Sequence, residues 1–110
     1  MYQGTTPALL LRVKGKDLTD ATVFVSIKTG TRVTTKTRED LTVTLDDEDT
    51  EVLCQLKQTD TLAMSDGEAE VQIRYVTDEG NAYATNKARF TVKDVLYKKV
   101  IEPADGDGDA

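Results

Sequence analysis

The stretch AEVQIRYV, residues 69–76, alternates apolar and polar side chains more regularly than any other part of this 110-residue chain. Its apolar side chains at alternate positions are Ala69, Val71, Ile73 and Tyr75. Because successive side chains of a strand point to opposite faces of a sheet, this alternation predicts a strand with one buried and one solvated face.

Shorter segments with the same period of two surround this strand. The segments predicted to be strands are residues 6–14, 22–28, 31–37, 41–45, 52–56 and 82–93. Residues 59–64 break the alternation and predict one helical turn that crosses between sheets, with Thr59 as its cap. About seven short strands without a long helical period favour an all-β, immunoglobulin-like antiparallel sandwich, with a small barrel as the alternative.

Two predicted strands have features that the structure can test. Residues 31–37 are β-branched but almost wholly polar, which indicates an edge strand whose Arg32, Lys36 and Arg38 discourage pairing with another chain. Asn86 falls on the inward parity of residues 82–93, which predicts a bulge or a strand end near it.

Parity also predicts where two aromatic side chains and the single cysteine lie. Tyr75 and Phe90 share the inward parity of neighbouring strands and are expected to pair across the sheet, whereas Tyr83 has no assigned place in the core. Cys54 lies between Val52 and Leu56 on an apolar face, where we expect it to pack as a small hydrophobic group.

Charge and cysteine content exclude several classes of function. The formal net charge is −6 and the pI is near 4.6, so nucleic acid and anionic membranes are not expected partners. One cysteine cannot form an internal disulfide, which is compatible with a reducing cytoplasm. The longest apolar run is residues 8–11, so neither a signal peptide nor a membrane span is predicted.

The residues that usually carry catalysis are missing or poorly placed. The chain has no histidine, and its acidic run at residues 46–51 falls at a predicted hairpin tip, where water keeps each carboxylate ordinary. Residues 105–109 imitate the start of a calcium loop but lack the closing glutamate. We therefore predict no catalytic residue, metal ligand or cofactor, and expect residues 1–101 to form one domain and residues 102–110 a disordered acidic tail.

Short motifs along the chain carry a resemblance to a known family. They are YQGTTP at residues 2–7, QTDTL at 58–62, AYATN at 82–86, and VKDVL at 92–96 followed by VI at 100–101. In these motifs the chain resembles small proteins encoded in the tail regions of tailed phages and prophages of Gram-positive bacteria, similar to the N-terminal domain of baseplate upper proteins. The resemblance spans nearly all of residues 1–101, although the acidic turn and the Asp-Gly tail are not part of the family pattern.

The resemblance implies a non-catalytic structural or adaptor protein of the virion, assembled in the cytoplasm of the bacterial host. The expected partners are other phage tail or baseplate proteins, and a homo-oligomer is a further expectation. The candidate interface residues are Tyr2, Gln3, Thr5, Pro7, Tyr83, Tyr97 and Ile101. Residues 2–7 either lie along a neighbour or close the chain's own sandwich. The alternative function is a binding module whose loops recognise a host-surface glycan or protein.

Overall fold

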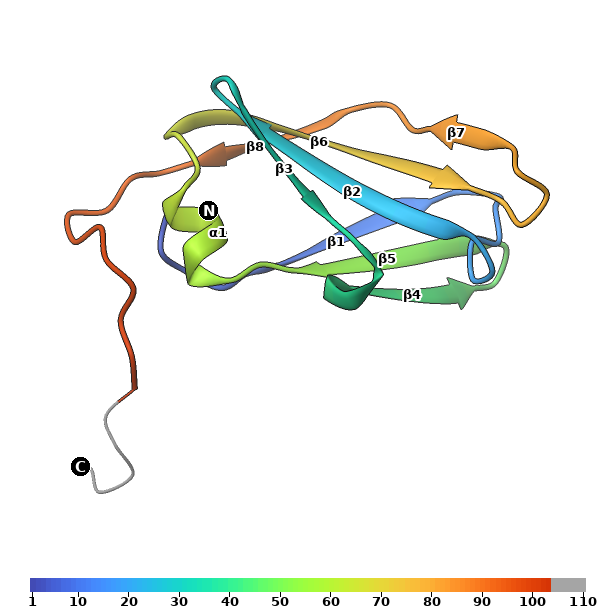
Figure 1. Ribbon diagram of the computed structural model, residues 1–110, viewed down its shortest axis with the longest axis horizontal. Helices are drawn as coiled ribbons and strands as arrows, with labels where there is room; N and C mark the ends of the chain where they lie inside the picture. The colour runs from blue at the N-terminus through green and yellow to red at the C-terminus, as the bar shows by residue number, and fades with distance from the viewer. Residues whose placement is uncertain (104–110) are drawn as a thin grey trace.

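Two antiparallel sheets face each other in the computed structural model, which describes residues 1–103 (Figure 1). The first sheet has the order β1 (Ala8–Val13), β5 (Asp49–Gln55) and β4 (Leu41–Asp46). The second has the order β3 (Arg32–Lys36), β2 (Thr22–Thr29) and β6 (Gly67–Val76), and the outer edge of β6 pairs with both β7 (Ala82–Ala84) and β8 (Ala88–Val92). The predicted mostly β, sandwich-like architecture is confirmed.

The described residues form eight strands, one more than expected, because the predicted strand at 82–93 is divided in two. Asn86 lies in the gap between β7 and β8, so the strand end predicted near it is confirmed. Within this gap, the N–H of Thr85 still donates to the carbonyl of Ile73 at 2.9 Å. The segment between β7 and β8 therefore stays next to β6, although the regular ladder of strand pairing is interrupted there.

The core lies between the two sheets and follows the period of two seen in the sequence. The alternate apolar positions of β6 are all buried, as predicted. They face side chains of the other sheet that are buried completely, namely Val52 and Cys54 of β5. In the register of the second sheet, Val25 of β2 lies opposite Ile73 of β6. Each sheet thus contributes one apolar face to a single core.

The helical turn predicted between the sheets is present as α1 (Gln58–Leu62), which connects β5 to β6. The predicted cap was wrong, because Thr59 lies inside the helix and Lys57 occupies the N-cap position. The backbone N–H of Lys57 donates to the carboxylate of Asp60 at 2.8 Å. A carboxylate near the first turn also interacts favourably with the partial positive charge of the helix N-terminus. A second short turn, the 3-10 helix η1 (Arg38–Asp40), connects β3 to β4.

The predicted pair of Tyr75 and Phe90 is not formed. Tyr75 lies opposite Tyr83 in the register of β6 and β7, and their rings stack with centroids 5.2 Å apart. Phe90 instead lies opposite Ala69. The prediction failed because the short connection at residues 77–81 brings Tyr83 opposite Tyr75, so Phe90, seven positions farther along, meets the other end of β6.

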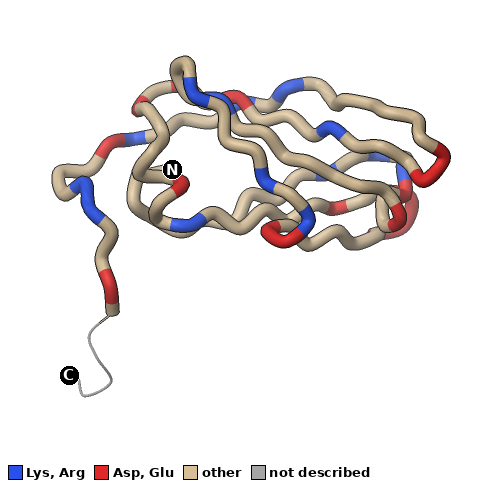
Figure 2. The backbone as a smooth tube through the Cα atoms, in the orientation of Figure 1, with Lys and Arg blue, Asp and Glu red and all other residues tan. Residues whose placement is uncertain are grey.

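The two ends of the molecule differ in composition. The N-terminus, α1 and the departing C-terminal segment share one end (Figure 1). The connections β1–β2, β4–β5 and β6–β7 lie at the other end, and each carries acidic residues, drawn red in Figure 2. Among the carboxylates of these connections are Asp17, Asp20, Asp47, Glu48, Asp78 and Glu79. The predicted calcium-like residues 105–109 lie outside the described residues, as does most of the predicted tail.

Candidate protein-interaction surface at the chain ends

The first three residues extend the chain's own second sheet. Tyr2 forms a parallel bridge with Lys93, directly after β8. The N–H of Lys93 donates to the carbonyl of Met1 at 2.7 Å, and the N–H of Gln3 donates to the carbonyl of Lys93 at 2.8 Å. Of the two roles considered for residues 2–7, the structure therefore shows these residues closing their own sandwich.

Gln3 connects the two chain ends inside the molecule. Only 8% of its surface is exposed. Its side-chain amide donates to the carbonyl of Met64 at 2.6 Å and accepts a hydrogen bond from the ammonium group of Lys98 at 2.7 Å. Since both amide atoms already have partners within the chain, Gln3 contributes to holding the C-terminal segment and offers little surface to a partner.

The segment after Lys93 is fixed to the body mainly through polar contacts. The side chain of Gln58 in α1 donates to the carbonyl of Ile101 and accepts from the N–H of Ile101, both at 2.8 Å. Lys98 attaches the segment through Gln3, while its ion pair with Asp94, with 3.6 Å between the charged atoms, lies within the segment itself. These hydrogen bonds hold the segment against the body without burying its large apolar side chains.

Those apolar side chains face solvent. Leu96 is fully exposed, and Tyr97 and Ile101 are each about 60% exposed, at 62% and 61%. We call these three side chains, with Tyr2 (52% exposed) and Val100 (39% exposed) from the same two terminal segments, the terminal surface: Tyr2, Leu96, Tyr97, Val100 and Ile101. A shallow hollow of about 240 Å³ adjoins it, lined among others by Thr5, Gln58, Tyr97 and Ile101. An apolar group of this kind on a surface indicates a protein contact.

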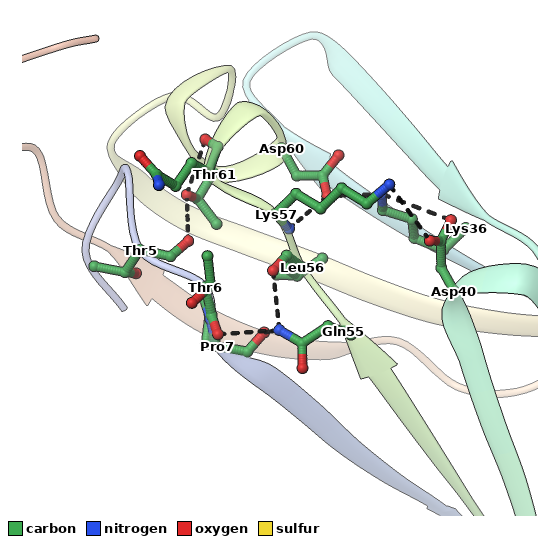
Figure 3. A network of polar contacts seen from close by, with 11 residues as sticks. Thr5, Thr6, Pro7, Lys36, Asp40, Gln55, Leu56, Lys57, Asp60 and Thr61 are labelled. Atoms are coloured by element: carbon green, nitrogen blue, oxygen red, sulfur yellow. Dashed lines mark hydrogen bonds and ion pairs between the residues drawn. The ribbon is translucent and has the colours of Figure 1, made fainter. Parts of the chain in front are cut away.

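The remaining predicted interface residues have different surroundings. Thr5 and Pro7 hold the start of β1: the carbonyl of Thr5 accepts from the hydroxyl of Thr61 at 2.8 Å, and the carbonyl of Pro7 accepts from the N–H of Leu56 at 3.0 Å. Figure 3 shows these residues beneath α1. Tyr83 lies in β7, toward the opposite end of the sandwich. The structure thus brings Tyr97 and Ile101 together but places Tyr83 elsewhere.

A buried ion pair stands next to this end of the molecule, where a solvated edge was predicted. Lys36 was expected to face solvent and discourage pairing of β3 with another chain, but only 7% of it is exposed. Its ammonium group lies 2.7 Å from the carboxylate of Asp60 and 3.9 Å from that of Asp40 (Figure 3). In the register of β2 and β3, Lys36 lies opposite the fully buried Val25, a pairing that the polar sequence of β3 does not reveal.

Asp60 remains ionised because its partners outweigh its burial. Burial alone would raise the pKa of this carboxyl, but hydrogen bonds from Lys36 and from the backbone of Lys57 lower it below the usual value. One carboxylate thus satisfies a buried ammonium group and the N-terminus of α1 together. This arrangement fixes α1, and with it the Gln58 contacts that hold the C-terminal segment.

The acidic turn at the opposite end is more ordered than predicted. Arg12 of β1 pairs with Asp46 and Asp49, each at 2.8 Å, and also with Glu51. The pKa of Asp49 is lowered, first by a hydrogen bond from the N–H of Gly15 and then by Arg12. The expectation that water keeps every carboxylate in this turn ordinary was therefore wrong for Asp49.

We searched residues 1–103 for a reactive thiol, a metal site and a membrane-spanning helix. Cys54 is buried, as predicted, and desolvation raises the pKa of its thiol to about 11, which disfavours the reactive thiolate. Within residues 1–103 there is no group of three or more cysteine or carboxylate side chains arranged to hold a metal ion. No helix in the same range is long and apolar enough to cross a membrane.

Comparisons with known proteins add no relationship. No protein-family model matches the chain, and neither a curated protein nor a solved structure matches it.

Proposed function

We propose that this protein is a non-catalytic structural or adaptor component of a phage tail or baseplate, acting through protein–protein contacts. The observation that supports this function best is the terminal surface, where a backbone held by Gln3 and Gln58 presents apolar side chains to solvent. Aromatic and large aliphatic groups on an ordered backbone are typical anchors of protein interfaces. The resemblance in the end motifs supplies the phage assignment, including a location in virions assembled in the host cytoplasm.

The strand order supports the immunoglobulin-like part of the proposal. In such sandwiches one sheet contains strands B, E and D and the other contains C, F and G, with C′ added in variable-type domains. β1, β5 and β4 have the order B–E–D, and β3, β2 and β6 have the order C′–C–F. β7 and β8 together take the place of G beside β6. We infer this topology from the order of pairing alone.

A mass-spectrometric experiment tests the assignment to a virion. Particles are sedimented from a lysate of the bacterium that carries the gene, after induction of its prophages, and the amount of this chain is compared with that of the other particle proteins. We expect the chain to sediment with the particles in a constant ratio across a density gradient. Its recovery only in the soluble fraction, with tail proteins present in the pellet, would contradict the proposal.

The second candidate is a loop-based module that binds a host-surface glycan or protein. It is favoured by the gathering of the β1–β2, β4–β5 and β6–β7 connections at one end, with the half-exposed Tyr83 close to the last of them. Tyr83 already stacks on Tyr75, however, and the ammonium group of Lys16 lies over its ring at 6.0 Å from the centroid, so part of the ring surface is already occupied. Binding of the purified chain to intact host cells, lost on Tyr83→Ala but not on Tyr97→Ala, would favour this candidate over the first.

A further inference from the structure

Both edges of the first sheet, β1 and β4, lack a further strand among residues 1–103, and the outer face of β1 is the more apolar of the two. Among residues 1–103, β1 pairs only with β5. The N–H of Leu56 donates to the carbonyl of Pro7, and Ala8 follows in the same register opposite Gln55. Because hydrogen-bonded and non-hydrogen-bonded pairs alternate in an antiparallel ladder, the N–H and C=O groups of Ala8, Leu10 and Arg12 point away from β5. These groups are free to pair with another strand.

The other sheet edges are covered, short, interrupted by an inward charge or, in β4, more polar on the outer face than β1. The end of β8 is covered by Met1 to Gln3, and β7 is only three residues long. The outward side chains of β4 include Thr42 and Thr44, and β3 ends in the buried ion pair of Lys36. β1 contains neither proline nor an inward-pointing charge, and its outward-facing Leu10 is 60% exposed. A long apolar edge of this kind is the one most ready to accept a strand.

The surroundings of β1 are suited to an apolar strand. Leu53, directly opposite Leu10 in β5, is 39% exposed on the same outer face. A groove of about 390 Å³ runs along β1 toward the gap between β7 and β8, and its lining includes Leu11, Val71 and Ile73. The edge therefore offers backbone partners together with apolar surface on both sides.

We propose that the occupant of this edge is β1 of a second copy of the chain, so that two three-stranded sheets join into one six-stranded sheet. A twofold axis at Leu10 places Leu10 opposite Leu10 of the second copy and Ala8 opposite Arg12 of the second copy. The free backbone groups then meet in hydrogen-bonded pairs. Leu10 and Leu53 of both copies form one continuous apolar strip, which gives a self-complementary interface.

Charge favours this occupant as well. In the twofold register, no charged side chain of β1 lies opposite another charged side chain, since Arg12 meets an alanine. The guanidinium group of Arg12 is already drawn toward Asp46, Asp49 and Glu51 of its own copy. The edge thus lacks the unpaired cation that would repel a second copy. Strand pairing of this extent buries less than about 1,200 Å², so the dimer is expected to dissociate on dilution.

Light scattering coupled to size-exclusion chromatography of the full chain tests the dimer over a range of concentrations. We expect the mass to rise from 12.1 kDa toward twice that value with concentration. Leu10→Lys opposes two ammonium groups across the axis and should weaken the dimer at least about tenfold. Val33→Lys is the matched control, because Val33 is 57% exposed on the edge strand of the other sheet. A monomer at all concentrations, or equal weakening by both variants, would overturn the proposal.

A disulfide experiment tests the register without relying on a charged variant. Leu10→Cys places two thiols opposite each other across the axis, where mild oxidation should link the copies, whereas Leu53→Cys lies one strand farther away and should link them much more slowly. Equal rates for the two variants would rule out the register. The proposal does not rest on the assignment to a phage: substitution of Leu96 should leave the dimer intact, and Leu10→Lys should leave the terminal surface intact.

Discussion

The ammonium group of Lys36 and the carboxylate of Asp60 lie 2.7 Å apart, with 8% and 14% of their side chains exposed. The contact joins the end of β3 to α1, which are separated by more than twenty residues in the chain. The pair therefore fixes the helix that connects the two sheets. It also positions Gln58, which holds the C-terminal segment.

Removing one partner of this pair should destabilise the fold strongly. Asp60→Ala leaves a buried ammonium group without its nearest carboxylate and removes the acceptor for the N–H of Lys57, so we expect a loss of about 3 kcal/mol in the free energy of unfolding. Lys36→Met should be milder, at about 1 kcal/mol, because Asp60 keeps the hydrogen bond from Lys57. Urea denaturation measures both values, and equal losses would contradict the account.

The same pair predicts how stability depends on pH. The folded pKa of Asp60 is lowered by its hydrogen bonds, so its contribution is fully present above the unfolded value of about 4 and is lost as the pH falls through the folded value. We therefore expect the difference in unfolding free energy between the natural protein and Asp60→Asn to shrink below about pH 4. A difference that stays constant between neutral and strongly acidic pH would be inconsistent with the ion pair.

Much of the fold could be predicted from the sequence because burial imposes a period of two. β6, β2 and β5 have clear apolar faces, and each was found with the expected side chains in the core. The turn at α1 was also found, because residues 59–64 lack that period. These features depend on local patterning, which a single sequence contains.

What could not be predicted depends on contacts between distant segments. Lys36 was interpreted as solvated because its buried partner, Asp60, is 24 positions away. The stacking of Tyr75 on Tyr83 depends on the register of β6 and β7, which is set by the length of the connection between them and not by the apolar pattern of either strand. Among the candidate interface residues, Gln3 and Tyr97 are both polar or amphipathic and near the chain ends, yet one is buried and the other exposed.

Cys54 should be unreactive in the folded protein. Its thiol is buried and its pKa is raised to about 11, so both access and thiolate formation are disfavoured. We expect no reaction with an aromatic disulfide reagent at neutral pH until urea unfolds the chain, whereas the exposed thiol of Val33→Cys should react at once. Rapid labelling of Cys54 under native conditions would show that the core opens at β5.

The cluster around Arg12 should contribute modestly and in a salt-dependent way. Arg12→Ala removes three ion pairs that join β1 to the β4–β5 turn. Because these side chains are partly exposed, we expect a smaller decrease in the melting temperature than for Asp60→Ala, and one that shrinks further in high salt. Arg32→Ala is the control, since Arg32 has no ion pair among the described residues. A larger effect than that of Asp60→Ala would contradict this ranking.

Truncations should distinguish the two chain ends. Deleting residues 95–110 removes the Lys98 bond to Gln3 and the Ile101 bonds to Gln58, so we expect only a small loss, about 1 kcal/mol, in the unfolding free energy. Deleting residues 1–4 removes the Met1 and Gln3 backbone bonds to Lys93 and the Gln3 bond to Met64, so we expect a loss of about 2 kcal/mol or more. Circular dichroism during thermal unfolding measures both. Unfolding of the chain that lacks residues 95–110 would make that segment part of the core.

The central claim is that the terminal surface is the contact through which the protein enters an assembly. Its most direct test is the incorporation of a variant carrying Leu96→Ser, Tyr97→Ser and Ile101→Ser into sedimented tail particles, measured against the natural chain by mass spectrometry. We predict a decrease of at least about tenfold, with folding unchanged, because these side chains supply the apolar contact area. Val33→Ser, at an exposed apolar position outside this surface, should be incorporated normally. Normal incorporation of the triple variant would contradict the claim.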